Sequence, residues 1–204
     1  MAKKKPSPAQ KPAPTDSAQA GQIYQFKITL LDIKPAIWRR IRIPDGTLAD
    51  LHEYIQVVFG WQGCHMHQFA IDGKQYSQQD PDGGNFDMDF EDESDVLISQ
   101  LISKSGRKPC WIYEYDFGDG WRHEMLFEGS PPSDPKAKYP ECVEGARACP
   151  PEDCGGPWGY ADYLAAIADP KHEQHEELLE WGGPFDPEAF DAKNATKEMR
   201  RVKP

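Results

Sequence analysis

The sequence predicts an α+β domain: a mixed β-sheet with a β-β-α-β core similar to a β-grasp, a second hairpin and C-terminal helices. Residues 23–31 and 37–43 are rich in β-branched and aromatic side chains, as strands are. Residues 48–58 repeat apolar side chains at helical spacing. Strand-like pairs with Gly-containing turns follow in residues 64–76 and 110–127. These observations predict the elements but leave the strand order open.

We expect one domain preceded by a tail. The chain has 204 residues, enough for a single domain with a sizeable core. Residues 1–20 are rich in Lys, Pro, Ala and Gln and offer little apolar surface, so they are predicted to form a disordered basic tail. Residues 21–204 would then form the single domain.

Composition disfavours two classes of partner. No stretch approaches the roughly 18 consecutive apolar residues of a membrane span, and no apolar segment follows the N-terminal lysines as it would in a signal peptide. The net charge of −11 is poorly suited to general nucleic-acid binding, which needs a basic face against the phosphates. We therefore expect a cytoplasmic protein with no membrane partner.

The second predicted strand, residues 37–43, has two different faces. Trp38, Arg40 and Arg42 share one face, and Arg39 lies with isoleucines on the other. After this strand, Thr47 and an Asp three residues later have the form of a capping box, so a helix should follow. Its amphipathic repeat continues to a Gly at position 60 that can end the helix in the left-handed conformation.

Two predicted hairpins follow the helix. Residues 64–71 alternate like a strand, and Asp72-Gly73 is a turn signal into residues 74–76. The second hairpin joins residues 110–117 to residues 121–127. Further helices are predicted at residues 96–102, 159–168, 172–181 and 187–200, the last of them capped by Asp186.

The second hairpin has a turn that can pair an acid with a histidine. If Asp119-Gly120 is a two-residue loop, Asp116 lies opposite His123, and with a four-residue loop Glu114 does. A carboxylate beside an imidazole is the arrangement of a metal-bound or acid/base histidine. The alternative is a sheet-surface ion pair beside aromatic core residues.

Two more histidines are separated by a single residue. On a strand, His65 and His67 point to the same side and could chelate one metal ion together. The alternative is that both are semi-buried polar residues next to Phe69.

Five cysteines without an export signal argue against a framework of disulfides. Cys142, Cys149 and Cys154 together with His123 would supply four ligands for zinc, although only the second of the two cysteine spacings falls in the zinc-finger range. Free, partly buried thiols in a rigid loop rich in Pro and Gly are the alternative.

Two acidic segments could bind a hard cation. Glu152 and Asp153 lie among the cysteines, where they could hold such an ion or simply cap the turn before Gly155. Residues 80–91 superficially resemble a calcium loop but lack the glycine and the flanking helices of an EF-hand. We interpret residues 77–95 as a solvated acidic loop.

Several short motifs together resemble a known family. They are Ile37 to Ile41, Leu48 to His52 with Gly60-Trp61, His65 to Phe69, Tyr115 to Asp119 with Trp121 and His123, Ala148 to Gly156, and Phe185 to Pro187. In this order they resemble the plasmid pRiA4b ORF-3-like family over roughly residues 22–192. The resemblance implies an α+β domain of bacterial and plasmid proteins without an assigned chemistry, some of which carry a TnpR resolvase label.

The resolvase label finds no support in the residues. A serine recombinase needs a nucleophilic serine near the first strand of its N-terminal domain, and this chain has no serine between Ser17 and Ser77. We also find no complete set of nucleophile, base and oxyanion donors. These absences favour a protein that is not an enzyme.

Three functions compete. The preferred one is a non-enzymatic binding or adaptor module, associated with plasmids or mobile elements, that binds a protein or small molecule. The alternatives are a metal-dependent hydrolase or nuclease-like enzyme, with zinc as its cofactor, and a DNA-associated recombination accessory protein that uses the Lys-rich tail and Arg39 to Arg42. The candidate functional surface consists of His65, His67, Asp116, Asp119, Trp121, His123, Glu152, Asp153 and Tyr160.

Overall fold

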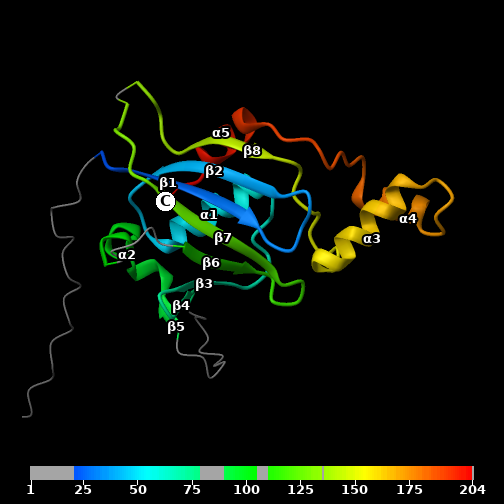
Figure 1. The fold of residues 1–204 in the computed structure, drawn as a ribbon, viewed down its shortest axis with the longest axis horizontal. Helices are drawn as coiled ribbons and strands as arrows, with labels where there is room; N and C mark the ends of the chain where they lie inside the picture. Colours follow the sequence, from blue (N-terminus) through cyan, green and yellow to red (C-terminus); the bar gives the residue numbers. More distant parts are fainter. Residues whose placement is uncertain (1–20, 79–89, 105–109, 135, 204) are drawn as a thin grey trace, which may run out of the picture.

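The computed structural model describes residues 21–78, 90–134 except 105–109, and 136–203 (Figure 1). Its strands are β1 (Ile23–Leu30), β2 (Ile37–Pro44), β3 (His67–Ile71), β4 (Lys74–Ser77), β5 (Phe90–Asp92), β6 (Cys110–Tyr115), β7 (Trp121–Gly129) and β8 (Glu141–Ala146). They form one open sheet in the order β5-β4-β3-β6-β7-β1-β2-β8. Only β4 and β5 pair in parallel among the described strands, so the sheet is mixed.

The helices are α1 (Leu48–Phe59), a 3₁₀ turn η1 (Glu93–Asp95), α2 (Ile98–Lys104), α3 (Gly156–Ala168), α4 (His175–Gly182) and α5 (Ala192–Met199). In Figure 1, α1 lies behind the sheet, whereas α3 and α4 lie together beyond the ends of the strands. α5 packs on α1 and β8. In the part of the chain that is described, no helix is both long and apolar enough to cross a bilayer. The α+β class is confirmed; the β-grasp likeness stays a prediction, and the tail 1–20 lies outside the described residues.

The predicted capping box begins α1 and is confirmed. The Thr47 hydroxyl accepts a hydrogen bond from the Asp50 N–H at 3.1 Å, and the Thr47 N–H donates to the Asp50 carboxylate at 2.7 Å. Gly60 ends the helix with φ 90°, a left-handed conformation that Gly adopts without a steric penalty. The apolar face, which includes Leu48 and Leu51, is fully buried against the sheet. Local sequence therefore determines this element.

The two faces predicted for β2 are also confirmed. Arg39 is buried with the isoleucines, and Arg40 lies on the opposite face, where Glu128 and Glu144 pair with it. Arg42 on the same face pairs with Glu141. Since carboxylates already engage both outer arginines, this strand does not present the basic face that phosphate contact would need.

Arg39 connects three parts of the fold. Its Nε donates to the carbonyl of Val58 near the end of α1 at 3.0 Å. Its Nη1 donates to the carbonyls of Trp38 and Ala146 at 2.8 and 2.9 Å. Its Nη2 donates to the carbonyl of Arg147 at 2.8 Å. The guanidinium therefore links β2 to α1 and to the end of β8.

The last predicted helix begins later than expected. α5 starts at Ala192 rather than at residue 187, and its N-cap is Asp191, whose carboxylate accepts from the N–H groups of Lys193 and Asn194. The carboxylate of Asp186 instead accepts from the Glu188 N–H in a turn. The predicted cap residue was wrong because two acids precede this helix and both can cap a turn. The predicted helices α2, α3 and α4 exist, with their first residues shifted by two or three positions.

We predict that Arg39→Lys lowers the free energy of unfolding by about 3 kcal/mol or more, because one ammonium group cannot reach carbonyls on three elements and leaves buried acceptors unpaired. The control is Arg40→Lys on the outer face of the same strand, which should cost about 1 kcal/mol or less. Urea unfolding of both variants measures the difference. Equal losses would show that Arg39 contributes no more than a partly exposed arginine.

Candidate functional site

The second hairpin is present, but both registers predicted for it were wrong. β6 and β7 pair Tyr113 with His123 and Tyr115 with Trp121, so residues 116–120 form the turn. This register places all four ring side chains on the buried face. Either predicted register would have placed a carboxylate opposite His123 on that face, where burying a charge is costly.

His123 is a core residue. It is fully buried, and its ring packs edge-on against Phe59 and Trp61 at 4.8 and 5.1 Å between centroids. Its Nδ1 lies 3.3 Å from the carbonyl oxygen of Tyr113. Burial lowers the pKa of His123 to about 3, so the imidazole is neutral near neutral pH. Among the described residues, His123 thus has no acidic partner.

His65 and His67 do not meet at one site. The strand β3 begins only at His67, whose buried Nε2 lies 2.8 Å from a carboxylate oxygen of Glu93. The ring of His67 also stacks on that of His52, with centroids 3.5 Å apart. His65 precedes the strand, so the pleat does not align it with His67.

His65 instead faces three carboxylates. Asp153 Oδ1 lies 3.2 Å from His65 Nε2. Asp116 Oδ2 and Glu152 Oε2 lie 3.7 and 3.8 Å from the same nitrogen. All four residues belong to the predicted surface, and we call them the His65 centre. In the described part of the chain, His65 Nε2 and Glu152 Oε2 are shielded from solvent and have no partner in hydrogen-bonding geometry.

The turn after β6 aims Asp116 at this centre. Asp116 has φ 55°, a left-handed conformation that Asp tolerates better than most residues. Its N–H donates to the carbonyl of Met66 at 2.8 Å, which ties the turn to the segment beside His65. Its Oδ1 accepts from the Gly118 N–H at 2.9 Å. The other oxygen, Oδ2, is the one that faces His65.

Glu152 is held in a similar way. Its Oε1 accepts from the Gln62 N–H at 2.8 Å and from the Tyr115 hydroxyl at 3.0 Å. Only 10% of its side chain is exposed. Burial and the bond to Glu152 raise the pKa of Tyr115 above its usual value, so its hydroxyl stays a donor. One oxygen of Glu152 is thereby fixed, and Oε2 remains available toward His65.

The loop that carries Glu152 and Asp153 is anchored at both sides. The indole N–H of Trp61 donates to the carbonyl of Pro150 at 3.2 Å. At the far side, the Gly155 N–H donates to the Asp119 carboxylate at 3.1 Å. Gly156 has φ 70°, and a Cβ there would lie 2.3 Å from the carbonyl oxygen of Asp119. Asp119 therefore docks this loop on the hairpin turn, and its Oδ2 is engaged in that contact.

Cys64, which lies near the centre, was missed from the sequence. The ligand atoms of Cys64, His65 and Glu152 all lie within 4.8 Å of one another. The Cys64 N–H donates to the Tyr115 hydroxyl at 3.2 Å. The only sequence signal for Cys64 was its position next to His65.

The remaining aromatic candidates are core residues. Trp121 is fully buried, and its ring centroid lies 6.1 Å from that of Trp61. Tyr160 is also buried and meets Phe185 edge to face at 6.2 Å. Neither side chain belongs to the His65 centre.

The predicted zinc ligands are not brought together. Within the described residues, the groups of three or more ligands whose atoms lie within 4.8 Å of one another are Cys64–His65–Glu152 and His65–Asp116–Asp153. Cys142, Cys149, Cys154 and His123 are not such a group. Burial raises the pKa of Cys142 to about 11 and that of Cys154 to about 12, so both thiols are protonated near neutral pH.

Two groups of three potential ligands share His65, Cys64–His65–Glu152 and His65–Asp116–Asp153, and the ligand atoms of each group lie within 4.8 Å of one another. Ligands that bind one ion at about 2.0–2.2 Å lie roughly 3–3.5 Å apart in tetrahedral or octahedral arrangements. The carboxylate oxygens lie 3.2–3.8 Å from the His65 nitrogen. One imidazole with carboxylates suits Zn²⁺, Mn²⁺ or Fe²⁺, and the adjacent thiol of Cys64 would favour the softer of these.

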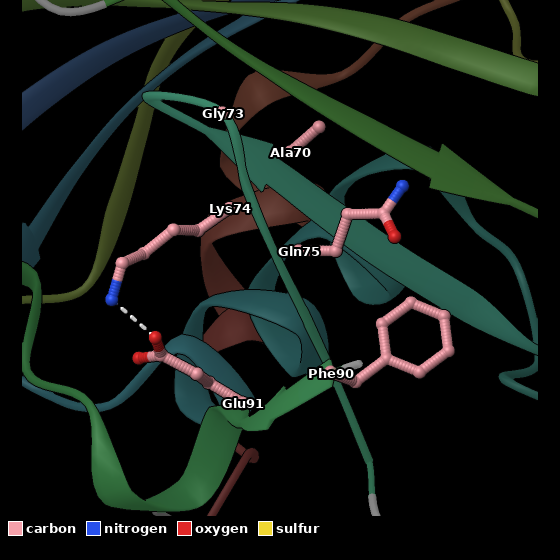
Figure 2. A pocket seen from close by; sticks show the side chains of 6 residues that line it. All are labelled: Ala70, Gly73, Lys74, Gln75, Phe90 and Glu91. Carbon is pink, nitrogen blue, oxygen red and sulfur yellow. Dashed lines mark hydrogen bonds and ion pairs between the residues drawn. The ribbon is translucent and has the colours of Figure 1, made fainter. Parts of the chain in front are cut away.

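A separate hollow of about 530 Å³ lies at the sheet edge where β4 meets β5 (Figure 2). Figure 2 shows the ion pair of Lys74 and Glu91 on one side of β4, and Gln75 and Phe90 on the other. None of the residues that line this hollow belongs to the predicted functional surface. Its lining consists of Ala70, Gly73, Lys74, Gln75, Phe90 and Glu91.

Comparison with known proteins finds relatives over most of the chain. The model of the plasmid pRiA4b ORF-3-like protein family matches residues 22–194. The uncharacterized protein y4hQ of Sinorhizobium fredii is 36% identical over 165 residues, which are 80% of this chain and 82% of y4hQ. The crystal structure of MM3350, a protein of unknown function from Methanosarcina mazei Go1, has a TM-score of 0.76 and 35% identity, and the match covers 85% of this chain and 97% of that one. These similarities confirm the resemblance predicted from the short motifs.

We predict that Gly156→Ala lowers the free energy of unfolding by about 2–4 kcal/mol, because a Cβ at this left-handed position also overlaps the Asp119 carbonyl. The control is Gly73→Ala, which has φ 80° but no atom within 4 Å of the added Cβ and should cost about 1 kcal/mol. Thermal unfolding compares the two. Equal losses would mean that the loop does not depend on its close approach to the hairpin turn.

Proposed function

This chain belongs to the plasmid pRiA4b ORF-3-like family, and we propose that it is a binding module whose ligand is a divalent transition-metal ion held at the His65 centre. The observation that carries the proposal is the pair His65 Nε2 and Glu152 Oε2. Both atoms are shielded from solvent and lack a hydrogen-bonding partner in the described residues, and they face each other at 3.8 Å. An unpaired buried carboxylate oxygen is costly, and a bound cation would offset that cost.

The charges around the centre favour the same ligand. Asp116, Glu152 and Asp153 converge on one imidazole, and in the described part of the chain their ion pairs all go to His65. No lysine or arginine among the described residues pairs with them. Like charges that share a small site repel one another, and a divalent cation would neutralise most of this charge. Asp116 and Glu152 are fixed by bonds through their other oxygens, so the ligands are preorganised for binding.

We predict that the chain binds one Zn²⁺ or Mn²⁺ ion, measured by calorimetric titration after purification without chelator, and that Glu152→Gln weakens binding at least 10- to 100-fold. The replacement keeps the size of the side chain but makes it a poorer ligand. Addition of the metal at 100 times its Kd should stabilise the wild type by about 2.7 kcal/mol. Substitution of Co²⁺ would report the ligand set through its visible absorption.

The matched control for this experiment is Glu114→Gln. Glu114 lies on β6, where its carboxylate accepts from the Gln68 amide at 2.7 Å, and it is not part of the His65 centre. Its replacement should leave metal affinity unchanged. A second variant, Cys149→Ala, tests the thiol loop. If Cys149→Ala abolishes binding and Glu152→Gln does not, the metal is held elsewhere and the proposal fails.

A metal-dependent hydrolase is a second candidate function, and the exposure of the centre favours it. The side chain of Asp153 is 68% exposed and that of His65 is 28% exposed, so one side of the centre is open to water. An open coordination position is what distinguishes catalytic from structural metal sites. A metal-bound water there could attack an ester bond.

We predict that, if the protein is a hydrolase, the metal-loaded chain cleaves a chromogenic phosphodiester or carboxylic ester, and that the rate disappears in Glu152→Gln but persists in Glu114→Gln. Initial rates with and without Mn²⁺ or Zn²⁺ measure this. Absence of turnover at full metal occupancy would leave the binding module as the function. The arginines of β2 do not favour the DNA-associated alternative, since Arg39 is buried and carboxylates pair with Arg40 and Arg42.

A further inference from the structure

A second pocket lies between α3 and α4, next to the loop that carries Asp153. Its volume is about 330 Å³, near the lower end of the range typical of ligand sites. α3 and α4 lie together beyond the ends of the strands (Figure 1). It holds side chains that no step of metal binding at the His65 centre requires.

The pocket is acidic. Asp153, Asp162 and Glu177 line it, and no lysine or arginine does. Asp162 and Glu177 are exposed, and neither forms an ion pair within the described residues. The three carboxylates come from a loop and two helices rather than from one helix face. A cationic group inside it would have an acid on several sides.

The walls of the pocket are aromatic. Tyr163 is 2% exposed, and its ring meets that of Trp181 edge to face at 5.8 Å. Trp181 is 49% exposed, which is unusual for an indole that packs on a buried ring. The Tyr163 hydroxyl is buried and has no hydrogen-bond partner among the described residues. Leu178 adds an apolar surface that suits a methylene chain.

We propose that this pocket binds an organic cation, an alkylammonium or guanidinium group such as a free polyamine or the side chain of a lysine or arginine in a partner peptide. Carboxylates supply charge, and the exposed indole face of Trp181 attracts a cation through its π electrons. The volume accommodates one extended amine-bearing chain. The proposal does not depend on a metal at the His65 centre, although Asp153 contributes to both sites.

In the experiment, the full chain is titrated in metal-free buffer, and binding is measured by calorimetry and by Trp fluorescence. One arm uses spermidine, and the other uses a capped glycine pentapeptide with a central lysine; the same peptide with an acetylated lysine is the neutral probe. Binding of spermidine alone assigns a free amine, and binding of the lysine peptide assigns a partner side chain. Either result supports the organic-cation site, provided that the acetylated peptide binds at least about fivefold more weakly.

Variants decide whether binding occurs in this pocket. Glu177→Gln and Trp181→Leu should each weaken binding about fivefold or more. Both positions are exposed, so their replacement leaves the core intact. The controls are Glu180→Gln on the same helix and Trp158→Leu, an 86% exposed indole on α3, neither of which lines the pocket. Asp153 is not used, because it also contacts His65.

Three results would overturn the proposal. The first is that neither cationic probe binds, and the second is that the acetylated peptide binds as tightly as the lysine peptide. The third is that Glu180→Gln weakens binding as much as Glu177→Gln does, which would indicate general attraction to an acidic surface. Metal titration of Glu177→Gln keeps the two sites distinguishable. Loss of amine binding with normal metal binding concerns this pocket alone, whereas loss of metal binding in Glu152→Gln concerns the His65 centre alone.

Discussion

The buried guanidinium of Arg39 is the interaction on which the rest of the molecule depends. A charge in the core is tolerated when hydrogen bonds replace its hydration, and here four main-chain carbonyls accept from the guanidinium. The guanidinium also lies over the rings of Phe59 and Phe190, 5.0 and 4.0 Å from their centroids. Four carbonyl acceptors and two aromatic faces replace the water that the charge would otherwise need. One side chain therefore ties α1 to the β2–β8 edge of the sheet, whose two strands are already joined by their own ladder.

This constraint extends from the core to the His65 centre. The carbonyl of Arg147 accepts from Arg39, and the loop that carries Glu152 begins there. The far end of the loop is held at Gly155 by the Asp119 carboxylate. With both ends fixed, the loop presents its acidic residues to the same side of the hairpin as His65. Ligands placed on a loop can be as well ordered as ligands on a strand when the loop ends are anchored in this way.

The sequence predicted what local rules determine. The capping box of α1, the two faces of β2 and the Asp72-Gly73 hairpin follow from side-chain spacing, and all are present. The register of the second hairpin did not follow, because turn chemistry alone allowed more than one loop length. The register is decided by the burial of all four ring side chains of the hairpin on one face of the sheet. That burial depends on the whole core. Convergence of His65 with Glu152 depends on contacts between segments far apart in the chain, and no local pattern encodes those.

Burial separates the candidate residues into two groups. His123, Cys142 and Cys154 have a pKa shifted by burial toward the neutral form, so they are held as uncharged core groups. His65 and Asp153 lie where the core ends and solvent begins, so a ligand can reach them without unfolding the chain. Asp153 lies between the His65 centre and the pocket of α3 and α4, so an ion in one site would change the charge available to the other. Ligands of the two sites should therefore influence each other reciprocally.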